Sequence, residues 1–293
     1  MRVRLERCGE DERTLTLPAR ATFDGRPVRL TYPTRTGALL RIDGATAGAF
    51  DGKHGTIDLA VPPGERELSV LVEQRSQPIA GLPAGDGLRW RRMLARAAQR
   101  PAETIGLESA PDAYGALPGA QRTEPPMAGH AHLDLAWLWT YADARRKALR
   151  TFATAVRQLA LDDRYVFAQS QAQLYAWVAA DDPDLFARVR ERAADGWDAS
   201  VAAMWVEPDL HAPSGESILR QFAYGVRYAS AELGVTPEVV WLPDTFGFPN
   251  TLPTLAAHAG LRFFATAKLQ WNESTRWPHP QFCWYGDDGS HLV

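Results

Sequence analysis

Hydrophobic and polar residues alternate in short runs through the first 85 residues, and glycine and proline separate the runs, as at Gly25, Pro27 and Gly64. A period of two is typical of strands that bury one face. The runs with this pattern are residues 15–17, 28–32, 39–42, 56–61 and 67–72. Residues 1–85 are therefore predicted to form a small β-rich N-terminal domain of the sandwich type, in which no residue points to catalysis.

The residue composition changes over residues 86–126. Residues 88–100 are rich in arginine and predict a basic amphipathic helix, whose charges we interpret as a solvated face. Residues 111–126 are rich in proline, glycine and alanine, which is typical of a linker. This region is therefore expected to connect two domains.

From residue 127 onward, predicted strands and helices alternate. Repeated βα units indicate an α/β fold in which helices surround a parallel sheet, either open or closed into a barrel. We count about five or six units, whereas a closed barrel needs about seven or eight. Because the chain stops at Val293 within a further predicted strand, we expect residues 127–293 to be an incomplete barrel from a longer protein. The expected strands are 127–134, 165–168, 199–206, 239–242 and 263–267, and the helices are 139–161, 174–194 with a break near 182–183, 217–233 with a cap at 214–216, and 252–259.

Composition narrows the class of protein. The chain has 293 residues, of which 45% are hydrophobic and 23% charged, as in ordinary globular proteins. A net charge of -3 gives no reason to expect nucleic acid or an anionic membrane as partner. The sequence contains no apolar run of about 18 residues, so no membrane span is predicted. The two cysteines lie far apart and the N-terminus lacks a signal-peptide pattern, so the cytoplasm is the expected location.

Two histidines and an aspartate alternate where the first predicted strand of the second region ends. His130, His132 and Asp134 would share one face of that strand, at the rim where parallel α/β folds place their active sites. Imidazole and carboxylate suit Zn²⁺, so His132 and Asp134 are candidate ligands, and His130 is either a ligand or a support for them. Such short motifs recur by chance, and alone this one would favour a plain hydrogen-bonded pair.

Further polar residues follow the later predicted strands. Asp244 follows residues 239–242 and is interpreted as a metal ligand, a nucleophile or a helix cap. Glu207 and Asp209 are interpreted as groups that hold substrate hydroxyls or support a metal, or that brace a loop. Lys268 lies at the same predicted rim and is interpreted either as a site residue or as a residue with a structural role. The ten tryptophans suit either packing against sugar faces or an aromatic core.

Taken together, these segments resemble the signature of the glycoside hydrolase family 38 α-mannosidases. The resemblance runs in order through residues 127–293 and is far more specific than any single motif. Residues 1–85 also look like the N-terminal domain of the family's cytosolic, vacuolar and bacterial branch. The segments that carry the resemblance are 129–139, 145–152, 167–171, 205–209, 215–221, 241–247 and 266–272.

The resemblance implies a fold, a metal and a mechanism. The fold is a seven-stranded βα barrel. The metal is a Zn²⁺ held by His132, Asp134, Asp244 and a second histidine. Asp244 is also implied to be the nucleophile of a retaining mechanism that passes through a covalent glycosyl-enzyme. Trp137 and Phe246 match positions that line the mannose subsite.

The chain departs from the family pattern in what it lacks. The family's fourth zinc ligand and its acid/base carboxylate lie downstream of residue 293, and none of His258, His279 or His291 lies in a matching motif. We therefore expect a zinc-dependent retaining hydrolase of terminal α-D-mannosides on oligosaccharides, inactive or nearly so as this fragment. Homo-oligomerisation and linkage preference stay open. A metal-dependent polysaccharide deacetylase-like enzyme, which would use a metal-bound water, and a non-catalytic carbohydrate-binding relative are the alternatives.

Overall fold

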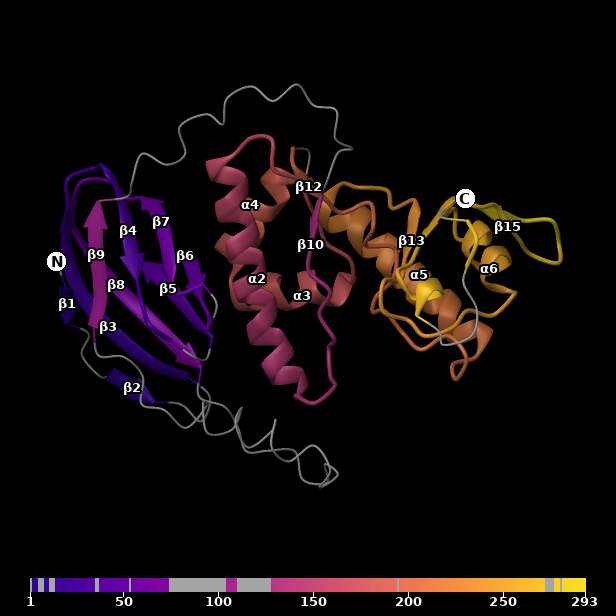
Figure 1. Ribbon diagram of the computed structural model, residues 1–293, viewed down its shortest axis with the longest axis horizontal. Coiled ribbons are helices and arrows are strands. Elements are labelled where there is room, and N and C mark those ends of the chain that lie inside the picture. Colours follow the sequence, from indigo (N-terminus) through magenta and orange to yellow (C-terminus); the bar gives the residue numbers. More distant parts are fainter. Residues whose placement is uncertain are drawn as a thin grey trace. The chain divides into compact units, whose positions relative to one another are not determined.

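The structure is a computed structural model, and the residues it describes fall into two compact units (Figure 1). The first unit comprises Met1–Pro126 and Ala136–Arg157, and the second comprises Met127–Leu135 and Gln158–Val293. The predicted helix at residues 88–100 and the predicted linker at residues 111–126 lie outside the described residues, and the domain boundaries predicted from the sequence stay predictions. The structure describes residues 2–4, 8–10, 14–34, 37–52, 54–73, 104–109, 128–193, 195–271, 277–279 and 281–293.

The first unit contains two antiparallel sheets, with strand orders β2-β3-β8-β5-β6 and β1-β9-β4-β7 (Figure 1). Every predicted run of alternating residues overlaps one of these strands. Leu17 and Leu68 from one sheet share a buried core with Leu30 and Ile105 from the other, so the sheets pack face to face as a sandwich. The strands are β1 (Arg2–Arg4), β2 (Cys8–Glu10), β3 (Thr14–Phe23), β4 (Pro27–Thr31), β5 (Ala38–Ile42), β6 (Ala45–Phe50), β7 (Thr56–Ala60), β8 (Gly64–Glu73) and β9 (Thr104–Ser109).

A buried ion pair links β4 to β7 in this sandwich. Arg29 and Asp58 are direct cross-strand partners. The guanidinium donates from Nε to Oδ1 and from Nη2 to Oδ2 of Asp58, each over 2.8 Å. The hydrogen bond from Arg29 lowers the pKa of Asp58; burial opposes this shift, and the charges of Arg29 and Arg157 add to it. The carboxylate is only 8% exposed, so its charge depends on this bidentate partner.

The second unit alternates strands and helices, which confirms the mixed α/β class. Strands β10, β11 and β12 form one parallel sheet, β13 and β14 form another, and β15 pairs antiparallel with β16. The expected seven-stranded barrel stays a prediction. Helix α2 (Tyr141–Leu161) lies mostly in the first unit. The elements of the second unit are β10 (Gly129–His130), β11 (Phe167–Ala168), α3 (Ala172–Asp181), α4 (Pro183–Arg192), β12 (Trp197–Asp198), α5 (Gly215–Tyr228), a π-helical turn (Ala229–Leu233), β13 (Val239–Trp241), α6 (Leu252–His258), β14 (Phe263–Ala265), a 3₁₀ turn (Lys268–Gln270), β15 (Trp284–Tyr285) and β16 (His291–Leu292).

Helix boundaries in the second unit follow the local signals in the sequence. Asp182 accepts a hydrogen bond from the backbone N–H of Leu185 over 2.9 Å, and Pro183 begins α4, so the predicted helical region divides at this point. The Ser214 hydroxyl accepts from Ser217 N over 3.2 Å and caps α5 as predicted. Among the described residues, no helix combines the length and apolar character required to cross a membrane.

The strands are shorter than the sequence predicted. The extended segment expected at 199–206 is wrong: β12 ends at Asp198, whose carboxylate accepts from Ser200 N over 2.8 Å and starts a turn. The strand expected over 127–134 is limited to β10. Beyond β10, backbone carbonyls of this segment accept hydrogen bonds from side chains of another segment, so the pairing of strands ends there. Polar side chains after the strand ends therefore lie in irregular segments.

Helix α5 packs unusually close to one of these segments. Ile218, Phe222 and Gly225 form its buried face. A Cβ atom at Gly225 would lie 2.4 Å from the carbonyl oxygen of Ala203 and 2.6 Å from the carbonyl carbon of Met204. Only a residue without a side chain allows this approach, which places the backbone of residues 203–206 against the helix.

The buried pair in the sandwich predicts a pH-dependent loss of stability. Asp58→Asn should lower the free energy of unfolding by about 1–3 kcal/mol at pH 7, because Arg29 loses a charged acceptor. The folded-state pKa of Asp58 is depressed. Its contribution is therefore present above the unfolded pKa of about 3.9 and disappears as the pH falls through the lower folded value. Urea unfolding at pH 7 and in acid would measure this. Asp24→Asn, in an exposed pair with Arg26, should change stability by less than about 0.5 kcal/mol. Equal effects of the two variants would contradict the interpretation.

The close approach of α5 predicts a steric effect at one glycine. Gly225→Ala should destabilise the chain by about 1–3 kcal/mol, because the new methyl group overlaps backbone atoms that cannot move aside cheaply. Gly215→Ala is the matched control in the same helix, since a Cβ atom added there would meet no other atom within 4 Å. Thermal unfolding would compare the two variants, and a Gly225→Ala protein as stable as the control would show that α5 is free to shift.

Candidate metal centre

Glutamine side chains join the irregular segments that follow the strands of the second unit. The Gln169 amide donates to the carbonyl of Ala131 over 3.2 Å, and the Gln171 amide donates to that of Leu133 over 2.9 Å. The Gln171 side-chain oxygen accepts from the backbone N–H of Glu207 over 3.1 Å. Gln171 is buried and has a φ of 68°, a conformation that few non-glycine residues adopt. The side chain of Gln171 therefore links the segment that carries His132 and Asp134 to the segment that carries Glu207.

Glu207 makes the next link. Its Oε1 accepts from the backbone N–H of Asp244 over 2.6 Å and lies 3.1 Å from the Thr245 hydroxyl, which donates to it. Its Oε2 lies 3.0 Å from Nδ1 of His132. The side chain is 4% exposed. A single buried carboxylate therefore contacts both the histidine of the first motif and the backbone that carries Asp244.

His132, Asp134 and Asp244 come together in one half-buried cluster. Each offers a ligand atom, and these atoms all lie within 4.8 Å of one another. Nε2 of His132 lies 3.0 Å from Oδ1 of Asp134 and 3.6 Å from Oδ2 of Asp244. Tetrahedral zinc with bonds of about 2.0–2.2 Å keeps its ligand atoms roughly 3.3–3.6 Å apart. The 3.6 Å separation agrees with this range, the 3.0 Å separation is slightly shorter, and the three donor types suit a divalent metal ion.

The electrostatics of the cluster favour a cation. Burial lowers the pKa of His132, but the hydrogen bonds and charges of Glu207 and Asp134 outweigh it and raise this pKa to about 9. The imidazole ring is therefore protonated at neutral pH when no metal is bound. A bound metal ion would take over the role of this proton as the positive charge among the carboxylates.

Lys268 contacts the other side of Asp244. Its Nζ lies 2.5 Å from Oδ1 of Asp244, and the side chain is 7% exposed. The same ammonium group lies 3.7 Å from the ring centroid of Trp271 and 4.3 Å from that of Phe246, within the range of cation–π attraction. Asp244 thus directs one oxygen toward His132 and the other toward a shielded positive charge.

His130 is occupied by structural contacts. Its Nδ1 lies 2.9 Å from the carbonyl of Ala168, and its Nε2 accepts from the indole N–H of Trp241 over 3.2 Å. Burial lowers the pKa of His130, although the bond to Ala168 opposes the shift. A neutral ring with Nδ1 protonated satisfies both contacts. His130 therefore supports the strands around the cluster and has no nitrogen left for a metal.

The other predicted site residues do not enter the cluster. Asp209 accepts from the backbone N–H groups of His211 and Ala212 over 2.7 and 2.8 Å, and these bonds lower its pKa. Phe246 is 68% exposed and stands at an angle to Trp271. Trp137 belongs to the first unit, where it is 65% exposed. Their roles in binding substrate stay predictions.

Sequence reasoning assigned no site role to the two bridging glutamines. Gln169 and Gln171 lie directly after β11 and are two residues apart, as are His130, the last residue of β10, and His132. That repeated spacing after an apolar strand was the available signal. Their bonds to backbone groups of other segments depend on tertiary contacts that the spacing does not reveal.

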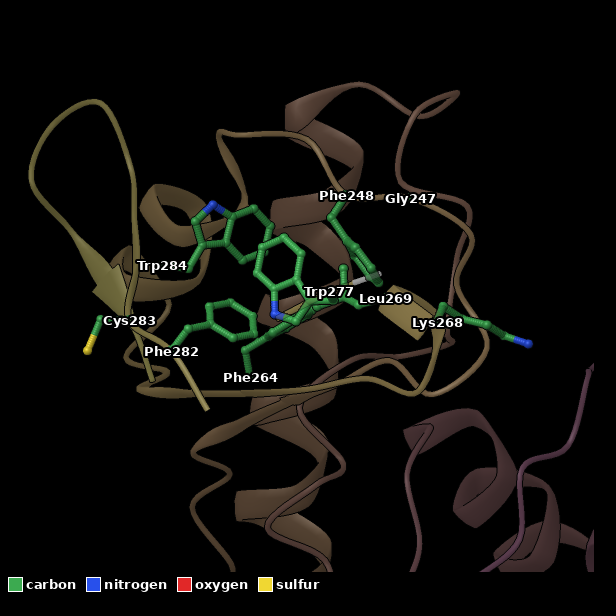
Figure 2. A pocket seen from close by; sticks show the side chains of 9 residues that line it. All are labelled: Gly247, Phe248, Phe264, Lys268, Leu269, Trp277, Phe282, Cys283 and Trp284. Carbon is green, nitrogen blue, oxygen red and sulfur yellow. The ribbon is translucent and has the colours of Figure 1, made fainter. Parts of the chain in front are cut away.

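An aromatic pocket of about 580 Å³ lies beside the Asp244 loop (Figure 2). Gly247 and Lys268 contribute to its wall. Figure 2 shows the ammonium end of Lys268 extending away from the aromatic rings that line the pocket. The pocket is therefore an apolar neighbour of the cluster and leaves the charge of Lys268 for Asp244. The aromatic residues that line it are Phe248, Phe264, Trp277, Phe282 and Trp284.

Comparison with known proteins identifies relatives that match a little more than half of the chain. Alpha-mannosidase G of Dictyostelium discoideum is 40% identical over 165 residues, 56% of this chain and 15% of that protein. Human alpha-mannosidase 2C1 is 41% identical over 165 residues, 56% of this chain and 16% of that protein. The alpha-mannosidase of Saccharomyces cerevisiae is 39% identical over 166 residues, 56% of this chain and 15% of that protein. The chain thus matches only a small part of each relative's length.

Among solved structures, a β-glucosidase from Kluyveromyces marxianus aligns with a TM-score of 0.21 and 10% identity, over 54% of this chain and 18% of that one, a similarity too low to support an argument. Residues 125–293 match the family described as "Glycosyl hydrolases family 38 N-terminal domain", which is more than half of the chain. The chain therefore belongs to glycoside hydrolase family 38.

Proposed function

We propose that the protein to which this chain belongs is a zinc-dependent retaining α-mannosidase that hydrolyses terminal α-D-mannosides of oligosaccharides. The observation that carries the proposal is the convergence of His132, Asp134 and Asp244, from strand ends far apart in the sequence, on one point. The proteins that this chain resembles are named alpha-mannosidases. Family membership and the cluster together therefore favour metal-assisted glycoside hydrolysis.

The metal would be held by the three clustered residues and by a ligand from outside the described residues. A bound zinc ion supplies Lewis acidity and a template for substrate oxygens. In mannose the hydroxyls O2 and O3 are cis, whereas in glucose they are trans, so a template for a cis-diol selects mannose. The exposed ring of Phe246, beside Lys268, is available to pack against a sugar.

Asp244 is proposed as the nucleophile. Its carboxylate attacks the anomeric carbon, the glycosidic bond breaks, and the leaving oxygen takes a proton from a carboxylic acid. Water then hydrolyses the glycosyl-enzyme with that second carboxyl group acting as base. Lys268 balances the charge of Asp244 from the side opposite to His132. We assign the acid/base role to none of the described residues and expect the 293-residue chain alone to be inactive or nearly so.

The cytoplasm remains the proposed location. Two cysteines in 293 residues, one of them the free and exposed Cys283, suit a reducing compartment. The net charge of -3 gives no reason to expect nucleic acid as a partner.

Activity of the full-length protein tests the proposal directly. It should hydrolyse an aryl α-D-mannoside, lose this activity with a chelator and regain it with zinc. Asp244→Ala should lower kcat by about 10³-fold or more, because the covalent step loses its nucleophile. Glu238→Gln, at an exposed pair with Arg262, is the control and should be unchanged.

Trapping separates the alternatives. A fluorinated mannoside should leave a covalent sugar on Asp244, visible by peptide mass spectrometry. Release of acetate from an acetylated polysaccharide without any adduct would support the deacetylase-like alternative. Sugar binding without turnover would support the non-catalytic alternative.

Metal binding by the 293-residue chain can be measured without activity. Asp134→Asn should weaken zinc binding by about 10-fold or more in calorimetry, because an amide oxygen replaces a charged ligand. Glu238→Gln again serves as the control. Equal zinc affinity of Asp134→Asn and the wild type would remove Asp134 from the ligand set.

A further inference from the structure

The buried carboxylate of Glu207 touches both halves of the candidate metal centre. We propose that Glu207 is a positioning residue that orients His132 for metal binding and holds the Asp244 backbone in place. This inference rests on the proposed function of the cluster. Of the roles that the sequence suggested for Glu207, it selects support of the metal over the binding of substrate hydroxyls.

The first step concerns the histidine ring. Nε2 of His132 faces the two aspartates, and Nδ1 faces Oε2 of Glu207 at 3.0 Å. The two atoms are at ion-pair distance without the alignment of a hydrogen bond. The negative charge of the carboxylate beside Nδ1 favours the form of the ring with a proton on that nitrogen, because a carboxylate attracts a donor and repels a lone pair. The lone pair of Nε2 is then directed toward the point where the aspartate oxygens converge. Carboxylates commonly orient metal-binding histidines in this way.

The second step concerns the nucleophile loop. The backbone N–H of Asp244 donates to Oε1 of Glu207 over 2.6 Å, a short bond to a charged acceptor. The hydroxyl of Thr245 lies 3.1 Å from the same oxygen. These contacts fix the position of the Asp244 backbone, from which its side chain extends. The two oxygens of Glu207 thus serve two different segments, and their fixed separation in one carboxylate sets the distance between His132 and Asp244.

The third step concerns the burial of Glu207. The carboxylate is only 4% exposed: Oε1 accepts hydrogen bonds, and Oε2 faces the ring of His132 at ion-pair distance instead of solvent. Its own backbone N–H is bonded to Gln171, whose amide reaches the carbonyl of Leu133, next to His132. Glu207 is therefore anchored from both ends to the segment that it orients. Buried and engaged by protein groups, this carboxylate is poorly suited to receive sugar hydroxyls.

Cobalt binding to the 293-residue chain tests the orientation of His132. Co²⁺ has visible absorption bands that respond to the number and arrangement of its ligands. Glu207→Gln should weaken Co²⁺ binding about 10–100-fold and alter these bands, because an amide N–H₂ facing Nδ1 favours a proton on Nε2. Glu207→Asp retains the charge but is one methylene shorter and should also weaken binding. Glu238→Gln should match the wild type.

A second measurement is independent of the metal. In the metal-free chain, the amide proton of Asp244 should resonate far downfield, as expected for a short bond to a carboxylate. Glu207→Gln should move this signal upfield and speed its exchange with solvent. The control Glu238→Gln should leave both unchanged. Far-UV circular dichroism establishes that each variant is folded.

The outcomes separate the two proposals. Unchanged Co²⁺ affinity and an unchanged Asp244 amide signal in Glu207→Gln would overturn the role of Glu207 and leave the metal site standing. If neither the wild-type chain nor the full-length protein binds Co²⁺, the proposed metal ligands lose their support. The amide measurement then still decides whether Glu207 holds Asp244. Altered binding and an altered amide signal, both absent in the control, support the inference.

Discussion

The second unit depends on partners for backbone groups beyond the ends of its short parallel strands. Strands β10, β11 and β12 each contain two residues, so the ladder of backbone hydrogen bonds ends early. Buried N–H and C=O groups still require hydrogen bonds, and side chains supply them. Gln169, Gln171 and Glu207 fill this role across four segments. The same side chains that satisfy the backbone therefore also determine where the polar residues of the candidate site lie.

Crowded carboxylates give the site its electrostatic character. Asp134, Asp244 and Glu207 all lie close to His132, and Lys268 pairs with the far oxygen of Asp244. Burial alone would make the histidine a weaker base, but the neighbouring negative charge dominates and raises its pKa to about 9. A site that stabilises a positive charge at the ring in this way is prepared for a cation. The proposed zinc ion follows from this balance as well as from the donor atoms.

Close packing elsewhere in the unit supports the same arrangement. The absence of a side chain at Gly225 allows α5 to lie against the backbone at Ala203 and Met204. The Gln221 side chain on that helix accepts from the backbone N–H of Val206 over 2.9 Å, directly before Glu207. On the other side, His130 joins β10 to β11 through the Ala168 carbonyl and to β13 through the Trp241 indole. Gln221 on α5 therefore holds the backbone next to Glu207, and His130 joins the strands that precede the cluster.

The sequence by itself determined the elements and the chemical candidates. Alternating runs predicted the strands of the sandwich, and Ser214 and Asp182 marked helix starts, because these signals act within a few residues. The polar residues His132, Asp134 and Asp244 stood out because each follows an apolar strand. Only the tertiary structure decided which atoms meet. It showed that both nitrogens of His130 are engaged and that Glu207 faces inward to His132. It also replaced the strand predicted at 199–206 with a turn. These outcomes depend on contacts between segments distant in sequence, which no local pattern encodes.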